Sequence, residues 1–116
     1  MLYIMDNGEI HLTRGDTAYI QVPIDKQMSD GTTEPYVMDA NDTLYFSVKS
    51  TVNDKACCFQ KKLVGSNLFH IEPEDTCHCA FGKYKYDVQL VTATGDVYTV
   101  VEPTCFKILA EVTTDA

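Results

Sequence analysis

Two short clusters of sulfur and nitrogen ligands are the strongest candidates for chemistry in this chain, Cys57-Cys58 and Cys77-His78-Cys79. Thiolates and an imidazole can bind zinc, and an imidazole beside a thiolate can activate a nucleophilic cysteine. Neither cluster has the usual spacing. Zinc sites separate paired cysteines by about two to four residues, whereas adjacent side chains on a strand point to opposite faces. We therefore predict no catalytic, metal-binding or cofactor-binding residue in these clusters.

The number of cysteines leads to a second expectation. The chain has five cysteines, an odd number, and its first residues, Met1 to Asp6, lack the basic and long apolar regions of an export signal. Disulfide frameworks are typical of exported proteins. We therefore expect free thiols, with the cysteines acting as small, weakly polar residues in a strand and a turn.

Acidic residues could form an acid–base pair at two places, Asp39 with Asp42, and Glu72 with Glu74 and Asp75. Both groups lie in predicted turns, where carboxylates commonly cap the backbone. Asp39, Asn41 and Asp42 also resemble half of a calcium loop, but the spacing and the final Glu of an EF-hand are absent. The histidines, His11, His70 and His78, are scattered, and no phosphate loop or nucleophile elbow accompanies them. We expect no enzymatic activity.

The tripeptide Arg14-Gly15-Asp16 matches a motif that integrins recognise. Three residues match by chance often, so we interpret the segment as a tight turn before a strand. In that turn Gly15 would supply a positive φ.

The charge balance limits the choice of partner. The net charge is −8, with a sequence pI near 4.6, so the surface repels phosphate backbones. The small basic groups, Lys61-Lys62 and Lys83 with Lys85, are interpreted as solvated strand faces. No apolar run approaches the ~18 residues of a membrane span. We expect no nucleic-acid partner and no membrane partner.

Short alternating runs between regular turn signals define the predicted fold. Thr17–Ile24, Leu44–Lys49 and Tyr84–Leu90 alternate large and polar residues with the period of half-buried strands. Roughly seven to eight such strands predict an all-β, immunoglobulin-like antiparallel β-sandwich that occupies residues 1–116 as one domain. The expected core residues share one parity of these strands: Ile20, Val22, Leu44, Phe46, Val48, Tyr86, Val88, Leu90, Phe106 and Ile108.

Local signals add two hairpins, a helical turn and a corner. Phe59–Leu63 is expected to pair with Leu68–Ile71, and Tyr84–Thr92 with Val97–Val101. One helical turn fits residues 74–79. Asp75, Gly82 and Tyr84 are expected to fix the loop before a central strand, with Tyr84 largely buried and its hydroxyl bonded to the backbone.

The order of motifs resembles a family of phage proteins. The motifs are Leu12–Thr17, Asp42–Lys49, Glu72–Thr76, Gly82–Leu90, Gly95–Thr99 and Phe106–Ile108. This order is similar to that of small structural proteins of phages and prophages of Gram-positive bacteria, including the N-terminal module of phage baseplate upper proteins. The resemblance covers nearly the whole chain, and the family pattern does not require the cysteines.

The resemblance implies an immunoglobulin-like sandwich and a non-enzymatic structural role in a phage particle, as a tail, baseplate or other virion component. The implied partners are other phage structural proteins or further copies of this chain, and the implied location is the virion, assembled in the bacterial cytoplasm. Solvent-facing residues such as Tyr45 and Lys49 could form part of the contact. The alternative function is a carbohydrate- or cell-surface-binding module, although the chain has no Trp. A small metal or thiol enzyme is a third hypothesis.

Overall fold

The computed structural model describes residues 2–51 and 58–111. Strands dominate this part of the chain, so the all-β prediction is confirmed. The elements are β1 (Leu2–Ile4), β2 (Ile10–Thr13), β3 (Ala18–Gln21), β4 (Asp25–Gln27), β5 (Thr33–Pro35), β6 (Thr43–Lys49), β7 (Phe59–Val64), β8 (Leu68–Ile71), α1 (Pro73–Thr76), β9 (Gly82–Val91) and β10 (Val97–Leu109). Within the described residues no helix is long and apolar enough to cross a membrane.

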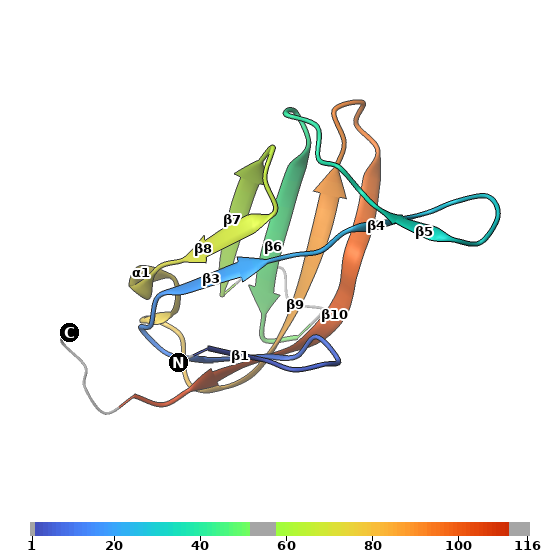
Figure 1. Ribbon diagram of the computed structural model, residues 1–116. Coiled ribbons are helices and arrows are strands. Elements are labelled where there is room, and N and C mark those ends of the chain that lie inside the picture. The colour runs from blue at the N-terminus through green and yellow to red at the C-terminus, as the bar shows by residue number, and fades with distance from the viewer. Residues whose placement is uncertain (1, 52–57, 112–116) are drawn as a thin grey trace.

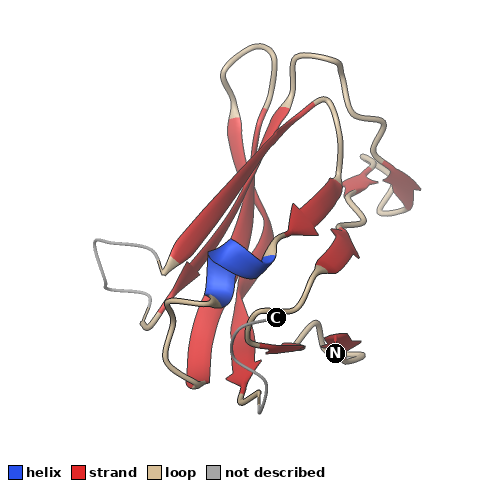
Figure 2. Ribbon diagram, turned by 90° about the vertical axis from the view of Figure 1, so that its left-hand side faces the viewer, coloured by secondary structure: helices blue, strands red, loops and turns tan. Residues whose placement is uncertain are grey.

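The strands form two layers and a projecting arm. The large sheet has the order β1-β2-β10-β9-β6-β7. The pair β3-β8 crosses one face of this sheet, as the two views in Figures 1 and 2 show. The β4-β5 hairpin extends away from both layers (Figure 1).

The expectation of purely antiparallel pairing is wrong at one position. β2 and β10 run parallel, with Ile10 opposite Phe106 and Ile108 opposite Leu12. Parallel neighbours require a long connection, and here almost the whole chain lies between the two strands. Because local turn signals cannot report such a distant pairing, the sequence pattern did not reveal it.

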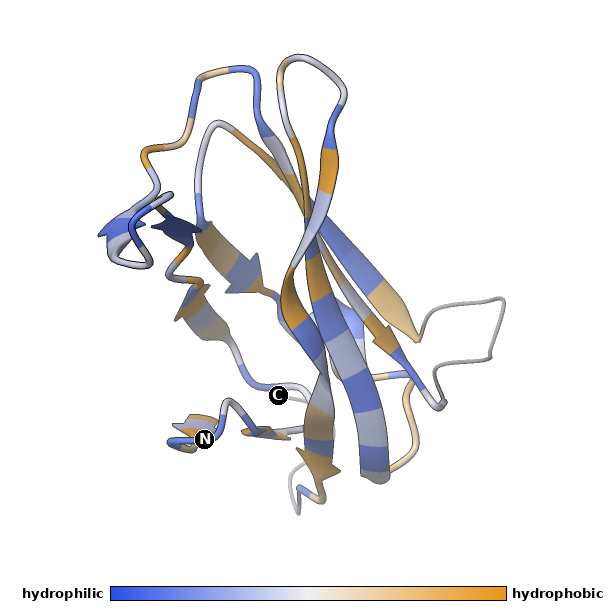
Figure 3. Cartoon of the chain, turned by 90° about the vertical axis from the view of Figure 1, so that its right-hand side faces the viewer, coloured by the Kyte–Doolittle hydropathy of each residue, from blue (hydrophilic) through white to orange (hydrophobic). Residues whose placement is uncertain are grey.

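The core lies between the two layers. All ten residues predicted for it are buried, which confirms the strand alternation. Figure 3 shows the same alternation as hydrophilic and hydrophobic bands along the strands of the large sheet. The structure adds further buried apolar residues: Ile10, Leu12, Ala18, Ile24, Phe59, Phe69, Ile71 and Cys79.

One predicted hairpin is replaced by a crossing between layers. β7 pairs with β6, and β8 pairs with β3, so the segments on either side of Gly65 are not partners. Gly65 has φ +71°, and its N–H donates to the Asp42 carbonyl. A Cβ there would lie 3.0 Å from the Ala40 carbonyl oxygen. This glycine therefore lets the chain turn out of the large sheet, so Phe69 enters the core from the opposite layer. The second hairpin, β9 with β10, is confirmed.

The predicted corner is present, with one correction. The Tyr84 hydroxyl donates to the Ala80 carbonyl at 2.7 Å, four residues upstream, but the Tyr84 side chain is only half-buried. Tyr84 stands near the start of β9, at the end of the core. The next residue of the same parity, Tyr86, is buried, and its hydroxyl donates to the Gly8 carbonyl.

These two hydroxyls lead to a graded prediction. Tyr84→Phe should lower the free energy of unfolding by about 0.5–1.5 kcal/mol, the usual net value of one hydrogen bond. Tyr86→Phe should cost more, about 1–3 kcal/mol, because it leaves a carbonyl without its donor beside the core. Urea denaturation of both variants measures the difference. Equal effects, or a larger effect at Tyr84, would contradict this ranking.

Candidate functional site

The outer face of the large sheet gathers most of the basic side chains. On β6 and β9 the parity opposite to the core points away from β3-β8, and it includes Lys49, Lys83 and Lys85. The chain has nine Lys and Arg residues in all. Five of them share this face, which we call the lysine face: Lys49, Lys62, Lys83, Lys85 and Lys107.

The strand register places four of these lysines directly opposite one another, and Lys62 opposite Tyr45. Lys83 pairs with Lys107 across β9 and β10, and Lys49 pairs with Lys85 across β6 and β9. Like charges in this position destabilise a sheet. Two acidic residues interact here, Asp87 on β9 and Glu102 on β10, and they are fewer than the five lysines. Burial first, and then Glu102, raises the pKa of the Asp87 carboxyl, whereas Lys49 lowers it. The arrangement therefore leaves positive charge that an acidic surface could neutralise.

The β4-β5 hairpin carries the opposite charge. All six of its strand residues are exposed, and Asp25, Asp30 and Glu34 outnumber Lys26. Its tip is ordered, because Asp30 Oδ1 accepts hydrogen bonds from the Thr32 N–H at 3.0 Å and hydroxyl at 2.6 Å. These bonds, from the hydroxyl first, lower the pKa of the Asp30 carboxyl. We call this hairpin the acidic arm.

The predicted acidic pair Asp39 and Asp42 has a structural role. Asp42 is buried, and its Oδ2 accepts the Tyr36 hydroxyl at 2.6 Å and the Asp39 N–H at 2.9 Å. Its Oδ1 accepts the Ala93 N–H at 2.9 Å. Protein donors thus engage both oxygens, which argues against the calcium loop and the acid–base pair. Asp39 Oδ1 in turn accepts the Asn41 N–H.

The second acidic group organises the helical turn α1, which confirms a helical turn here, although it spans Pro73–Thr76 and not the expected residues 74–79. Asp75 Oδ2 accepts the Glu72 N–H at 2.8 Å and forms an ion pair with Lys61 Nζ at 3.0 Å. A carboxylate at this position caps the free N–H groups of a helix start. Lys61 consequently points to the core side of β7, away from Lys62, so these two neighbours do not form a patch.

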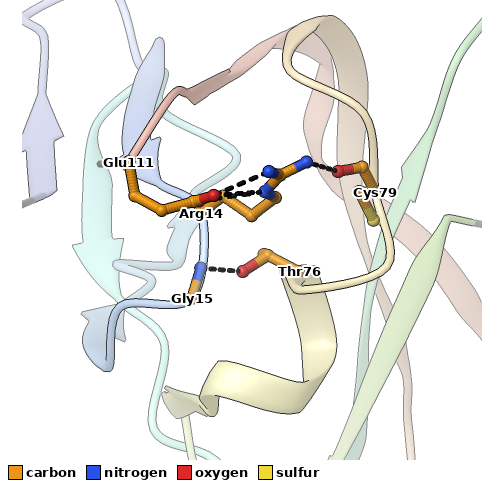
Figure 4. Close-up of polar contacts among 5 residues, drawn as sticks. All are labelled: Arg14, Gly15, Thr76, Cys79 and Glu111. Carbon is orange, nitrogen blue, oxygen red and sulfur yellow. Dashed lines mark hydrogen bonds and ion pairs between the residues drawn. The ribbon is translucent and has the colours of Figure 1, made fainter. Parts of the chain in front are cut away.

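Arg14-Gly15-Asp16 forms the expected turn, and Arg14 is fully engaged (Figure 4). Gly15 has φ +82°, and the Asp16 N–H donates to the Thr13 carbonyl. Arg14 donates to Glu111 through Nε and Nη2, at 2.6–3.1 Å, and to the Cys79 carbonyl at 3.1 Å. The Gly15 N–H donates to the Thr76 hydroxyl. The Glu111 bond raises the pKa of Arg14 and lowers that of Glu111.

The expectation of five free thiols is wrong. Cys58 and Cys79 form a disulfide, and their Cα atoms lie 6.6 Å apart. The turn after α1 places Cys79 beside Cys58, the residue just before β7, so one cysteine from each cluster bonds to the other. Strand alternation disfavours a site built from adjacent cysteines, but it gives no information about a disulfide between the two clusters. Cys77 and Cys105 are free, and Cys57 lies outside the described residues.

The histidines are not brought together. His11 lies on β2, with Nε2 3.9 Å from Glu9, and His70 stacks on Tyr19 across β8 and β3. His78 follows α1, and its ring contacts the Cys58 carbonyl at 3.0 Å. Cys58, His78 and Cys79 are the group of described residues whose ligand atoms could hold a metal ion.

Comparison of the chain with protein-family models, with curated proteins and with solved structures finds no match in any of them.

Proposed function

We propose that this protein is a non-enzymatic assembly protein that works by contacts between copies of itself, with the acidic arm of one copy on the lysine face of the next. The separation of charge carries this proposal. An acidic chain of net charge −8 places five lysines on one sheet face, two pairs of them directly opposed. Its acidic arm projects from another part of the molecule (Figure 1).

A contact between two different surfaces is heterologous, so repeated copies build a ring or a filament. Such an arrangement suits a component of a phage or prophage particle, the role that the order of sequence motifs implies. The immunoglobulin-like assignment belongs to the same proposal. Two β layers support it, as does the Tyr84 hydroxyl bonded to the backbone upstream, as in a tyrosine corner.

Charge reversal should abolish the association. The double variant Lys83→Glu/Lys107→Glu is expected to sediment as a monomer at a salt concentration where the parent chain associates, and high salt should dissociate the parent. Sedimentation velocity at low and high ionic strength measures both effects. Lys26→Glu is the control, because it makes the same type of charge reversal once, on the acidic arm, and should preserve association.

Mixing two defective variants tests the pairing of the surfaces. Asp30→Lys/Glu34→Lys reverses the charge of the acidic arm but retains the lysine face. This variant should be monomeric alone, yet form a dimer with Lys83→Glu/Lys107→Glu, since one intact arm and one intact face remain in the mixture. Monomers in the mixture would contradict the proposed contact. Mass spectrometry of particles from an induced host tests the phage assignment separately, and particles that assemble, infect and lack this chain would overturn it.

A second function, carbohydrate or cell-surface binding, is favoured by a different feature. Tyr19 and His70 stack with ring centroids 4.5 Å apart and an interplanar angle of 5° on the outer face of β3-β8. Tyr19 is 61% exposed, so the pair offers a flat ring surface to a ligand. A glycan-binding screen of the parent chain and of Tyr19→Ala distinguishes this function, because assembly through the lysine face should not depend on Tyr19.

A further inference from the structure

Cys58, His78 and Cys79 form a compact cluster at the end of the core where β7 begins. One ligand atom from each residue lies within 4.8 Å of the other two. Cys79 is buried, Cys58 is half-buried and His78 is exposed. His78 and Cys79 lie in the turn after α1 rather than on a strand, so strand alternation does not separate their side chains.

Backbone contacts hold both cysteines in place independently of the bond between their sulfurs. The Cys58 N–H donates to the Val48 carbonyl at 2.6 Å, and the Cys79 N–H donates to the Thr76 carbonyl at 2.9 Å. The Cys79 carbonyl also accepts from Arg14 at 3.1 Å. Reduction removes none of these hydrogen bonds. The two thiols should therefore stay close together after the disulfide is broken.

One contact of His78 is typical of a metal-binding histidine. Its Nδ1 lies 3.3 Å from the Glu74 carbonyl, and its Nε2 lies 3.0 Å from the Cys58 carbonyl. A neutral imidazole carries only one N–H, so it can donate to only one of these carbonyls. Metal-bound histidines commonly donate the N–H of one ring nitrogen to a backbone carbonyl and bind the metal with the other nitrogen. Glu74 can serve as that carbonyl, and the ring must then rotate so that Nε2 turns from the Cys58 carbonyl oxygen towards the two sulfurs.

We propose that reduction of the Cys58–Cys79 disulfide creates a zinc site whose protein ligands are Cys58, Cys79 and His78. A dithiol reductant transfers two electrons and two protons to the disulfide, giving two protein thiols and the disulfide of the reductant. A phosphine transfers two electrons, and water supplies the two protons and the oxygen of the phosphine oxide. Zn²⁺ then displaces one proton from each thiol and binds two thiolates and one imidazole, with water in the fourth position. Zinc–sulfur bonds of about 2.3 Å place the two sulfurs about 3.8 Å apart in a tetrahedral site. Side-chain rotation alone can reach this separation from Cα atoms 6.6 Å apart.

This ligand set is specific for soft or borderline metals. Two thiolates and an imidazole select zinc over magnesium or calcium, which prefer oxygen ligands. The two thiolates neutralise the charge of the ion, so the buried side of the site remains without net charge. The site is independent of the lysine face and of the acidic arm.

The test uses cobalt as a spectroscopic substitute for zinc. In the triple variant Cys57→Ser/Cys77→Ser/Cys105→Ser, Cys58 and Cys79 are the remaining cysteines. After phosphine reduction, this chain should bind one equivalent of Co²⁺ with the charge-transfer and visible bands of a tetrahedral thiolate site, and one equivalent of Zn²⁺ should remove the bands. The unreduced chain should show none. His78→Ala should lose the tetrahedral spectrum, whereas His70→Ala, the matched control outside the cluster, should retain it.

A second measurement uses the parent chain and does not depend on the folding of the triple variant. Thiol titration of the denatured, unreduced chain should find at most three of its five cysteines reactive. In the reduced, folded chain, Zn²⁺ should protect Cys58 and Cys79 from alkylation and leave Cys77 and Cys105 reactive, as peptide mapping would show. Absence of metal binding after reduction, equal binding before reduction, or an unchanged spectrum in His78→Ala would overturn the proposal.

Discussion

Phe46→Ala is expected to lower the free energy of unfolding by about 3–5 kcal/mol, the cost of removing a fully buried aromatic ring. Phe46 has no exposed surface and lies at the centre of the core. Its ring contacts the rings of Phe59, Phe69, Tyr86 and Phe106, with centroids 5.0–6.3 Å away. These partners come from both layers of the molecule, so the cavity would weaken the contact between the layers.

Urea denaturation followed by circular dichroism measures this loss. Val37→Ala is the matched control, because Val37 is 85% exposed and its truncation should change stability little. A Phe46→Ala variant with the parent's unfolding midpoint would contradict the packing of β3-β8 on the large sheet.

Asp42→Asn is expected to lower the melting temperature by roughly 10 °C at neutral pH, since three donors depend on its carboxylate. An amide can present one oxygen, so its NH₂ group must face either Ala93 N–H or the pair of donors from Tyr36 and Asp39. Asp42 itself is buried, so an NH₂ group that faces a donor there has few other partners. Asp42 joins the segment before β6 to the turn between β9 and β10, so both segments should loosen together.

The pH dependence of the stability difference between the parent chain and Asp42→Asn shows whether the charge of Asp42 or the shape of its side chain is responsible. The Tyr36 hydroxyl first, and then the N–H groups of Asp39 and Ala93, hold the pKa of Asp42 below its ordinary value of 3.8. A lowered pKa stabilises the folded state fully above the ordinary value, and this contribution disappears as the pH falls through the folded-state pKa. The difference between the parent chain and Asp42→Asn should therefore be constant near neutrality and shrink in acid. Asp25→Asn, on the exposed arm, provides the control.

The same hydrogen bond has an alkaline consequence. It raises the pKa of Tyr36 to about 12. Because this pKa is raised, the neutral Tyr36 stabilises the fold fully at pH values below 10.0, the ordinary pKa of tyrosine. This contribution to stability is lost as the pH rises through about 12. Spectrophotometric titration of the parent chain should show one tyrosine that ionises near pH 12, and this tyrosine should be missing from Tyr36→Phe.

Strand alternation made most of the core predictable. Phe46 and Val88 were assigned correctly because a shift of one residue would expose every large side chain of their strands. Residues whose burial depends on distant partners were missed. Asp42 and Thr76 are polar residues that sequence reasoning places at the surface, and only the donors gathered around them explain their burial. The parallel pairing of β2 with β10 likewise has no local signal.

The candidate sites were predictable only in part. The parity of Lys83 and Lys85 was clear from the alternation, but the strand register decided that Lys107 faces Lys83 and that Lys49 faces Lys85. The two cysteine clusters were weighed as candidate ligands and set aside, and the disulfide between them depends on where α1 places Cys79. Lysine pairs across strands and disulfides between distant segments depend on how the strands and layers pack. The sequence of one chain does not reveal that packing.

The position of β10 in the large sheet has a consequence for biosynthesis. β10 lies between β2 and β9, and its pairing joins Ile10 to Phe106. A ribosome releases the N-terminal segment first, so β2 has no partner on that side until β10 emerges. Contacts between such distant residues slow folding, because a long loop must close before they form. We therefore expect a nascent chain that ends before β10 to expose an unpaired strand edge and to require the last strand for cooperative folding.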